Sequence, residues 1–466
     1  MDNFEQQQTA NNAKQLGQII VGIDVGTTKI AVFVGSRQKG GKVNIIGMGK
    51  SASVGVIHGE VRNVQKTAES VRLAVEQAQK MTGIEIKEAY VGIAGHNIRN
   101  TMMKGTKIIG QEDHIITEDD IDTLINEQYN LSLEPGNSII DIVPQDYIID
   151  GETGITDPVG RIGKKIECNF NLISGDDNNI TNIKISMDLA GIKVKGLILE
   201  PIASSEAVVS SSEKTAGICL VDIGGGTTDM AVFQEGILRH TAVIQLAGNS
   251  ITNDIKEGFR IMQNQAEALK TRYGDCLDVE TQKETIIQVP GLRGMAPREI
   301  TLYALSRTIK ARLEMILQQV DYELKNDSYD KLLIAGIVLT GGGSKLKHIA
   351  QYTEYITGIT TRIGEPDDSF TAADTIDYQD PMYSTGIGLV LKGFEYEDKN
   401  SLPQEDMVIA PENSQEQTDQ TEISANKKDK KEKDKKTKMR SKTKDAGRFV
   451  DKVSNFFNRL LVDSEE

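Results

Sequence analysis

Two segments of the chain share one pattern of apolar and polar positions. Residues 22–33 read GIDVGTTKIAVF and residues 221–233 read VDIGGGTTDMAVF. In both, β-branched apolar residues flank an Asp, a glycine turn and a Thr-Thr pair, and alternation continues beyond the turn, which predicts a β-hairpin. The second copy has two additional glycines. Two such copies far apart in the sequence indicate two related halves that face one another.

The tips of these hairpins are suited to binding phosphate. A glycine turn followed by Thr residues exposes backbone N–H groups and hydroxyls without bulky side chains, and such concave arrays bind phosphate oxygens. One hairpin alone is also compatible with an ordinary tight turn, whereas its repetition favours a phosphate held from both sides. The candidate phosphate-binding residues are Asp24, Gly26, Thr27, Thr28 and Lys29 in the first copy, and Gly224, Gly225, Gly226, Thr227 and Thr228 in the second.

Acidic residues accompany the predicted phosphate sites. Asp24 and Asp222 open the two turns and would repel phosphates, so we expect a divalent cation between them, held through water. A predicted strand in residues 197–208 (LILEPIASSEAV) places Glu200 at a strand end just before Pro201. Glu200 and Asp222 are therefore the candidate catalytic residues, the first to orient an attacking water and the second to hold the hydrated cation. An ordinary surface position is the alternative for Glu200.

A third glycine-rich turn lies in the second half of the chain. Residues 331–345 read KLLIAGIVLTGGGSK, an apolar strand that runs into Gly341, Gly342, Gly343 and Ser344, and the following SKLKHIAQY has a helical pattern. Consecutive glycines let the backbone approach a planar ligand closely, as at the adenine and ribose of a nucleotide. The turn by itself is weak evidence.

Composition limits the function classes. The chain has 466 residues, 53 Lys and Arg against 68 Asp and Glu, and a net charge of -15. This length predicts about three domains, and the acidic balance argues against a whole-protein nucleic-acid binder. Cys168, Cys219 and Cys276 form no CxxC pair, so neither a disulfide framework nor a zinc ribbon is indicated. The sequence has no signal-peptide core and no apolar run of about 20 residues, which favours an acidic, soluble, cytoplasmic protein.

The last part of the chain differs from the rest. Residues 395–424 are acidic and polar, and residues 427–448 hold 10 Lys and 2 Arg against 4 acids, a local balance of 12 − 4 = +8. Neither stretch can bury enough apolar surface to offset the entropy of ordering, so both are predicted to be disordered. The folded part should therefore end near Gly393.

A short amphipathic segment follows at residues 446–462. On a helix, one continuous apolar face would be formed by Phe449, Val450, Val453, Phe456, Phe457, Leu460 and Leu461. Such a helix after a basic run is typical of binding to an anionic membrane surface. Packing on the protein's own core or on a partner is the alternative. A nucleic-acid patch is disfavoured, because the basic run has no aromatic residues and the remainder of the chain is acidic.

Taken in order, these motifs resemble the actin-like ATPase superfamily. The matching segments are residues 24–29, 200–208, 222–229, 341–344 and 383–391, the last a predicted final helix, and no GxxxxGK[ST] motif is present. The resemblance implies an α/β fold of two ribonuclease-H-like lobes with Mg-ATP in the cleft between them. It also implies that Glu267 and Lys270 hold the ribose and adenine side, an exposed helix face being the alternative.

An interruption between residues 85 and 172 narrows the resemblance. Its strands and an acid-capped helix starting after Thr117 predict a small α+β module, and this resembles subdomain 1C, an SHS2-like insertion, of the FtsA cell-division family. The likeness covers roughly residues 17–394. The expected organisation is a disordered 1–16, subdomain 1A (17–84, 173–214 and 375–394), 1C (85–172), 2A (215–246 and 329–374), 2B (247–328), a disordered linker (395–445) and the membrane-targeting helix (446–462).

The family resemblance implies a function as well as a fold. It implies an ATP-binding protein with at most slow hydrolysis, which polymerises on the cytoplasmic face of the membrane at midcell. There it would tether the FtsZ ring by binding the FtsZ C-terminal peptide through subdomain 2B, and other division proteins through 1C. A small-metabolite kinase or a chaperone-type ATPase on the same fold is the alternative. Against these, the sequence has no recognisable substrate domain and no β-rich peptide-binding domain after the core.

Overall fold

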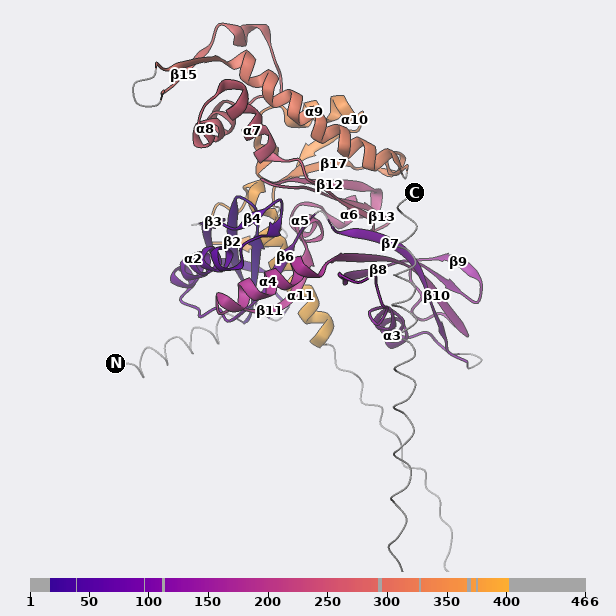
Figure 1. Cartoon of the computed structure of the whole chain (residues 1–466). Coiled ribbons are helices and arrows are strands. Elements are labelled where there is room, and N and C mark those ends of the chain that lie inside the picture. The colour runs from indigo at the N-terminus through magenta and orange to yellow at the C-terminus, as the bar shows by residue number, and fades with distance from the viewer. Residues whose placement is uncertain are drawn as a thin grey trace, which may run out of the picture. The chain divides into compact units, whose positions relative to one another are not determined.

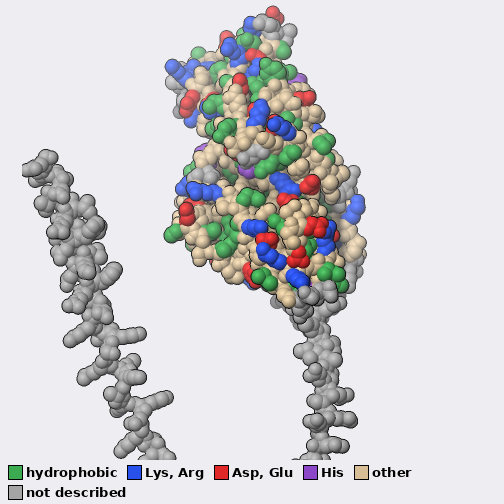
Figure 2. Space-filling model, turned by 90° about the vertical axis from the view of Figure 1, so that its right-hand side faces the viewer, with side chains coloured by type: hydrophobic (Ala, Val, Ile, Leu, Met, Phe, Trp, Pro, Cys, Tyr) green, Lys and Arg blue, Asp and Glu red, His purple; other side chains and the backbone are tan. Residues whose placement is uncertain are grey.

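The computed structural model describes residues 17–401, apart from residues 39, 96, 111–113, 292–295, 327, 367–369 and 374–375. The predicted disordered N-terminus, most of the predicted linker and the predicted amphipathic helix at 446–462 lie outside the described residues. Within the described part, no helix is long and apolar enough to span a bilayer. Basic and acidic side chains are interspersed over the described part of the face in Figure 2.

The first lobe is built on a six-stranded sheet in the order β11-β6-β1-β2-β3-β19. Its strands are β1 (Gln18–Val25), β2 (Lys29–Arg37), β3 (Asn44–Ala52), β6 (Glu88–Ile93), β11 (Lys193–Leu199) and β19 (Thr371–Ala372). β2 pairs antiparallel with both β1 and β3, and its pairing with β1 confirms the first predicted hairpin. β6 pairs in parallel with β1 on one side and with β11 on the other. The short β4 (Val56–Ile57) and β5 (Glu60–Val61) form a separate hairpin.

Helices cover both faces of this sheet. Alternate side chains of β1 point to opposite faces, so Val21 and Ile23 pack with α2 (Val64–Thr82) and α4 (Asp177–Leu189). Ile20 packs on the other face, with α5 (Glu200–Val208) and α11 (Ser384–Ser401). Figure 1 shows α11, from the end of the described chain, beside these early strands.

The second lobe has a five-stranded sheet in the order β14-β13-β12-β17-β18. Its strands are β12 (Ile218–Ile223), β13 (Thr228–Gln234), β14 (Ile237–Ile244), β17 (Gly336–Thr340) and β18 (Thr361–Ile363). The antiparallel pairing of β12 and β13 confirms the second predicted hairpin. The long helix α9 (Leu302–Asn326) and α10 (Ile349–Thr357) pack on one face of the sheet, and the short α6 (Ser211–Ala216) leads into β12.

A smaller unit extends the second lobe. It contains α7 (Gly248–Phe259), α8 (Gln263–Tyr273) and the hairpin β15 (Ile286–Val289) and β16 (Arg298–Thr301), which pack with part of α9 around their own buried cluster. In Figure 1 this unit forms the upper end of the molecule. Short 3₁₀ turns stand at Glu280–Lys283, Tyr329–Leu332, Gly342–Lys345 and Pro381–Tyr383.

The predicted α+β insertion is a separate four-stranded sheet in the order β7-β10-β8-β9. Its elements are β7 (Arg99–Ile108), α3 (Glu118–Gln128), β8 (Asn137–Ile149), β9 (Glu152–Ile155) and β10 (Lys165–Asp176). Thr117 caps α3 in a reciprocal capping box with Asp120, as the acidic start of this segment predicts. Its core is formed by residues such as Leu124, Ile166 and Phe170.

Two expected boundaries of the insertion and of subdomain 2A are wrong. The insertion predicted at 85–172 begins too early in the sequence, because β6 (Glu88–Ile93) belongs to the first sheet, where it pairs in parallel with β1 and β11. Residues 371–372, expected in subdomain 2A, form β19 and pair with β3 of the first lobe. Both corrections follow from hydrogen bonds to strands that are distant in the sequence.

The expected end of the folded part is also wrong. Helix α11 (Ser384–Ser401) continues past residue 394 into the segment predicted to be disordered. Its last turns are held by ion pairs of Asp398 with Arg37 and of Glu397 with Lys195, both 2.5 Å. The segment 197–208 is likewise not a continuous strand, since β11 ends at Leu199 and α5 begins at Glu200.

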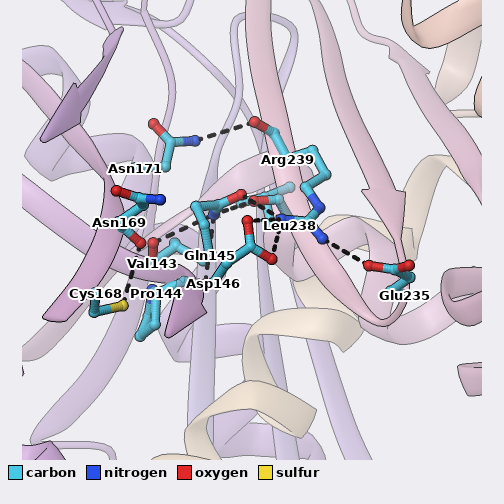
Figure 3. A network of polar contacts seen from close by, with 10 residues as sticks. All are labelled: Val143, Pro144, Gln145, Asp146, Cys168, Asn169, Asn171, Glu235, Leu238 and Arg239. Carbon is cyan, nitrogen blue, oxygen red and sulfur yellow. Dashed lines mark hydrogen bonds and ion pairs between the residues drawn. The ribbon is translucent and has the colours of Figure 1, made fainter. Parts of the chain in front are cut away.

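The insertion also touches the second lobe, where it covers the free edge of β14 (Figure 3). The Gln145 amide donates to the carbonyl of Leu238 at 2.9 Å. The Arg239 guanidinium lies 3.4 Å from the Asp146 carboxylate, and the Asn171 amide donates to the Arg239 carbonyl at 3.5 Å. Carbonyl groups at the edge of β14 thus accept hydrogen bonds from amide side chains of the insertion.

Candidate functional site

The two hairpin tips meet between the lobes. A Cβ at Gly225 would lie 2.6 Å from Oγ1 of Thr28, and a Cβ at Gly226 would overlap the side chain of Thr27. Each glycine therefore lets the backbone of the second tip lie against a Thr of the first. The prediction that the two halves face one another through these turns agrees with this geometry.

A third segment joins the two tips. The turn between β4 and β5 places the ring Nδ1 of His58 3.0 Å from the carbonyl of Gly226. The next residue, Gly59, donates its N–H to Oγ1 of Thr27 at 2.9 Å. His58 adopts a left-handed φ of 50°, which is strained for a residue with a side chain and is maintained by these contacts. Neither residue was predicted, because nothing in the local sequence marks a turn that bridges two lobes.

Four carboxyl groups gather at the base of the tips. Asp24, Asp222 and Asp229 are buried, with exposed fractions of 5%, 8% and 4%, and Glu200 is half-buried at the first position of α5. Burial raises the pKa of Asp24 to about 6 and that of Asp229 to about 8. Burial also raises the pKa of Asp222, and it raises the pKa of Glu200 well above its usual range. The neighbouring carboxylates raise the pKa of Glu200 further, whereas Lys29 opposes this shift.

The sequence reasoning found three of these four acids and missed Asp229. A signal for it was present, because Asp229 follows the Thr-Thr pair of the second copy where Lys29 follows that of the first. Thr227 donates to Oδ2 of Asp229 at 2.9 Å, while Oδ1 is buried and has no hydrogen-bond partner among the described residues. A buried carboxyl oxygen without a donor is suited to a cation or to its water.

The acids fit a magnesium ion held indirectly. Within the described part of the chain, no group of three or more His, Cys, Asp or Glu side chains has the arrangement of a metal site. A hard cation such as Mg²⁺ often keeps several waters and takes its remaining ligands from one or two carboxylates and the phosphates of a nucleotide. Asp24 and Asp222 fit that mode of binding, and their roles remain predictions.

The residues predicted for the ribose and adenine side also lie together. Lys270 pairs with Glu267 at 2.8 Å on α8, and its ammonium donates to the Gly248 carbonyl at 3.0 Å. Gly248 begins α7, and its own N–H donates to the carbonyl of Gly224 at 3.0 Å. The Glu267–Lys270 pair is thereby connected to the second hairpin, predicted to bind phosphate, by one chain of hydrogen bonds.

The predicted glycine turn closes the other side of the hairpin. Gly341 has a left-handed φ of 81°, and a Cβ there would overlap Oδ1 of Asp222. The Ser344 hydroxyl donates to the Gly341 carbonyl at 2.8 Å and closes the turn, while a Cβ at Gly342 would meet no atom within 4 Å. The helix predicted immediately after the turn begins later, at Ile349, behind a 3₁₀ turn at Gly342–Lys345.

Comparison with known proteins gives consistent matches. The family model "Cell division protein FtsA" matches residues 219–388, and the model "SHS2 domain inserted in FTSA" matches residues 95–174. The FtsA of Pseudomonas aeruginosa is 36% identical over 381 residues, covering 82% of this chain and 90% of that protein. The FtsA of Escherichia coli K12 is 33% identical over 386 residues, covering 81% and 91%.

Solved structures confirm the fold at much lower identity. The PilM-PilN type IV pilus biogenesis complex matches with a TM-score of 0.60 at 14% identity, covering 80% of this chain and 98% of that one. MreB 5 of Spiroplasma citri bound to AMPPNP matches with a TM-score of 0.50 at 15% identity, covering 83% and 99%. The predicted actin-like ATPase fold with an inserted SHS2 domain is therefore confirmed, and the SHS2 match agrees with an insertion that begins after β6.

Proposed function

Because this chain belongs to the FtsA family of cell-division proteins, we propose that it binds Mg-ATP between its lobes, polymerises on the cytoplasmic membrane face and tethers the FtsZ ring there. The observation that carries the nucleotide part is the meeting of two glycine-rich tips above a cluster of buried carboxyl groups. The tips supply N–H groups and Thr hydroxyls for the phosphates. Glu267 and Lys270 bind the ribose, and the glycine turn at 341–344 contacts the base.

In this proposal three acids of the carboxyl cluster have two tasks. Asp24 and Asp222 hold the hydrated Mg²⁺, which would neutralise phosphate charge. Glu200, on the first turn of α5, orients the attacking water. Burial and the neighbouring carboxylates raise the pKa of Glu200 well above its usual range, which favours its protonated form in the nucleotide-free protein. In this proposal hydrolysis is at most slow, as the family resemblance implies, and nucleotide binding rather than turnover controls the polymer.

An equilibrium titration tests the nucleotide site. Full-length protein is titrated with a fluorescent ATP analogue in Mg²⁺, and Asp222→Asn should abolish Mg-ATP affinity because it removes the charge that holds the cation. Asp188→Asn, at an exposed position on α4, is the control and should bind like the wild type. Retained affinity in Asp222→Asn would refute the role given to Asp222.

Membrane attachment is assigned to the predicted helix at 446–462. α11 ends at Ser401, and the basic run at 427–448 lies between that end and the apolar segment, where it would attract anionic lipids. One such helix binds reversibly, and a polymer carrying many binds with avidity. Deleting residues 446–466 should abolish flotation with anionic liposomes. Deleting residues 403–423, a segment of the same length in the acidic stretch, should leave flotation intact; equal flotation of both proteins would contradict the tether.

A groove in the predicted subdomain 2B is our candidate for the FtsZ peptide. It has a volume of about 890 Å³ and lies between the α7–α8 turn and the β15–β16 hairpin. Two arginines, Arg260 and Arg298, line it against one acid, Glu299, together with apolar residues such as Met262, so it offers a net positive charge and apolar surface to an extended peptide. Peptide anisotropy should show weaker binding for Arg298→Glu, with Arg272→Glu, an exposed position on α8, as the control.

One sedimentation experiment tests the assembled proposal. Full-length protein is centrifuged with ATP, anionic vesicles and the FtsZ C-terminal peptide, and each component is omitted in turn. We expect polymer on the vesicles only with ATP, and peptide in the pellet only with the protein. Pelleting that is independent of ATP and of vesicles would count against it.

A further inference from the structure

We propose that Ser204 and Thr385 are positioning residues, which fix the carboxylate of Asp222 for the cation of a bound nucleotide. The proposal rests on the proposed nucleotide-binding function. The two hydroxyls come from α5 and α11, and the acid stands on β12 of the second lobe. Residues from three elements, one of them 163 positions from Asp222 in the sequence, therefore converge on one carboxylate.

The geometry directs both hydroxyls toward one oxygen. The Ser204 hydroxyl donates to Oδ2 of Asp222 at 2.8 Å, and the Thr385 hydroxyl lies 3.2 Å from the same atom. The two hydroxyl oxygens are 2.9 Å apart. Each hydroxyl has a single proton, so either both donate to Oδ2, or Thr385 donates to Ser204, which donates to Oδ2. The reverse order, in which Ser204 donates to Thr385 and Thr385 donates to Oδ2, is also possible. In every arrangement Oδ2 is held from the side of the two helices.

The other oxygen of Asp222, Oδ1, accepts from neither of these hydroxyls. A Cβ at Gly341 would overlap Oδ1, which places this oxygen against the 341–344 turn. Ser204 and Thr385 are buried, with exposed fractions of 0% and 8%, so bulk water cannot readily replace a lost hydroxyl. One oxygen is thus restrained by protein donors, and the second is presented in a fixed direction to the water shell of a cation.

The crossing of the two helices makes this arrangement possible. A Cβ at Gly388 would overlap the carbonyl of Ala203, so α5 and α11 approach backbone to backbone one turn from the hydroxyl pair. Ser205, the next residue on α5, is equally buried, yet its hydroxyl donates to the Ile202 carbonyl of its own helix at 2.7 Å. Ser205 is therefore a matched control, because it has the same residue type, helix and burial but no contact with Asp222.

The test separates cation-dependent from general effects. Full-length wild type, Ser204→Ala, Thr385→Val, Thr385→Ser and Ser205→Ala are titrated with a fluorescent ATP analogue across a range of Mg²⁺ concentrations and in EDTA. We expect Ser204→Ala and Thr385→Val to need about 10-fold more Mg²⁺ for half-maximal binding, with affinity in EDTA unchanged. Thr385→Ser keeps the hydroxyl and should therefore retain the Mg²⁺ dependence of the wild type. Ser205→Ala should also leave this dependence unchanged.

Each outcome decides the proposal. An equal loss of affinity with and without Mg²⁺, or no change at all, would overturn the positioning role while leaving nucleotide binding intact. Failure of the wild type itself to bind Mg-ATP would instead reject the proposed function. Thermal melts of every variant identify loss of folding; if Ser204→Ala does not fold, the comparison of Thr385→Val with Thr385→Ser decides the question.

Discussion

Replacing Asp229 with Asn should stabilise the nucleotide-free protein and flatten its stability against pH. In the folded chain the pKa of Asp229 is raised from 3.8 to about 8, first by burial and then by the charge of Asp222. Between these two values the folded state keeps a proton that the unfolded state has released. Stability is therefore lost as pH rises through this window, and the loss is complete above pH 8.

The size of the effect follows from the same values. At 1.36 kcal/mol per pH unit, holding Asp229 protonated at pH 7 costs on the order of 4 kcal/mol of unfolding free energy. Asn keeps the shape and can accept the Thr227 hydroxyl bond without this cost. For a chain of this length the gain corresponds to a rise in melting temperature on the order of 5 °C.

Thermal unfolding in EDTA provides the assay. Wild type, Asp229→Asn and the exposed control Asp188→Asn are melted at pH 5.5 and pH 8. We expect the wild type and the control to lose stability toward pH 8, and Asp229→Asn to lose less; some loss remains because the pKa values of Asp24, Asp222 and Glu200 are also raised. Equal losses in all three proteins would show that Asp229 is not held protonated and would refute the reasoning. Asp229→Asn should also bind Mg-ATP more weakly, as expected where a destabilising buried acid serves a site.

Two further predictions concern single contacts. Lys270→Ala removes the ammonium that connects α8 to Gly248, and it should weaken nucleotide affinity about 10-fold, whereas Arg272→Ala on the exposed part of α8 should not; fluorescent-nucleotide titration measures both. Gly388→Ala forces a Cβ into the Ala203 carbonyl at the α5–α11 crossing, so thermal melts should show a loss on the order of 3 kcal/mol, whereas Gly258→Ala, with no atom within 4 Å, should be neutral or slightly stabilising.

Local patterns predicted the parts of the fold that are decided locally. The two hairpins were predictable because Asp, glycine and Thr-Thr stand between alternating apolar residues. The start of α3 was predictable because a Thr N-cap followed by acids satisfies the first N–H groups of a helix. β6 was misplaced because its apolar run EAYVGI suits either subdomain, and only pairing with distant strands assigns it. The last turns of α11 depend on Arg37 and Lys195, which are equally distant.

The residues of the candidate site likewise fall into those that the sequence predicted and those that it did not. Asp24 and Asp222 were predicted because each opens a repeated turn, whereas the Glu267–Lys270 pair was predicted only from the family resemblance. The hydroxyls on Asp222 were not predicted, since a Ser on α5 and a Thr on α11 have no distinctive local pattern. Residues that act through convergence of separate elements require the tertiary structure.

Elements near the end of the described chain, β19 and α11, complete the first lobe. The first lobe therefore cannot complete its folding until these elements have been synthesised. β1 and β2 are made first, but one of their faces is covered by α11, and the outer edge of β3 is paired by β19. Until those residues emerge from the ribosome, apolar side chains such as Phe33 and Ile20 have no partner from α11. The core of the first lobe is therefore completed late in synthesis. The segment predicted to bind the membrane follows α11 in the sequence, so it is synthesised after every element of the proposed nucleotide site.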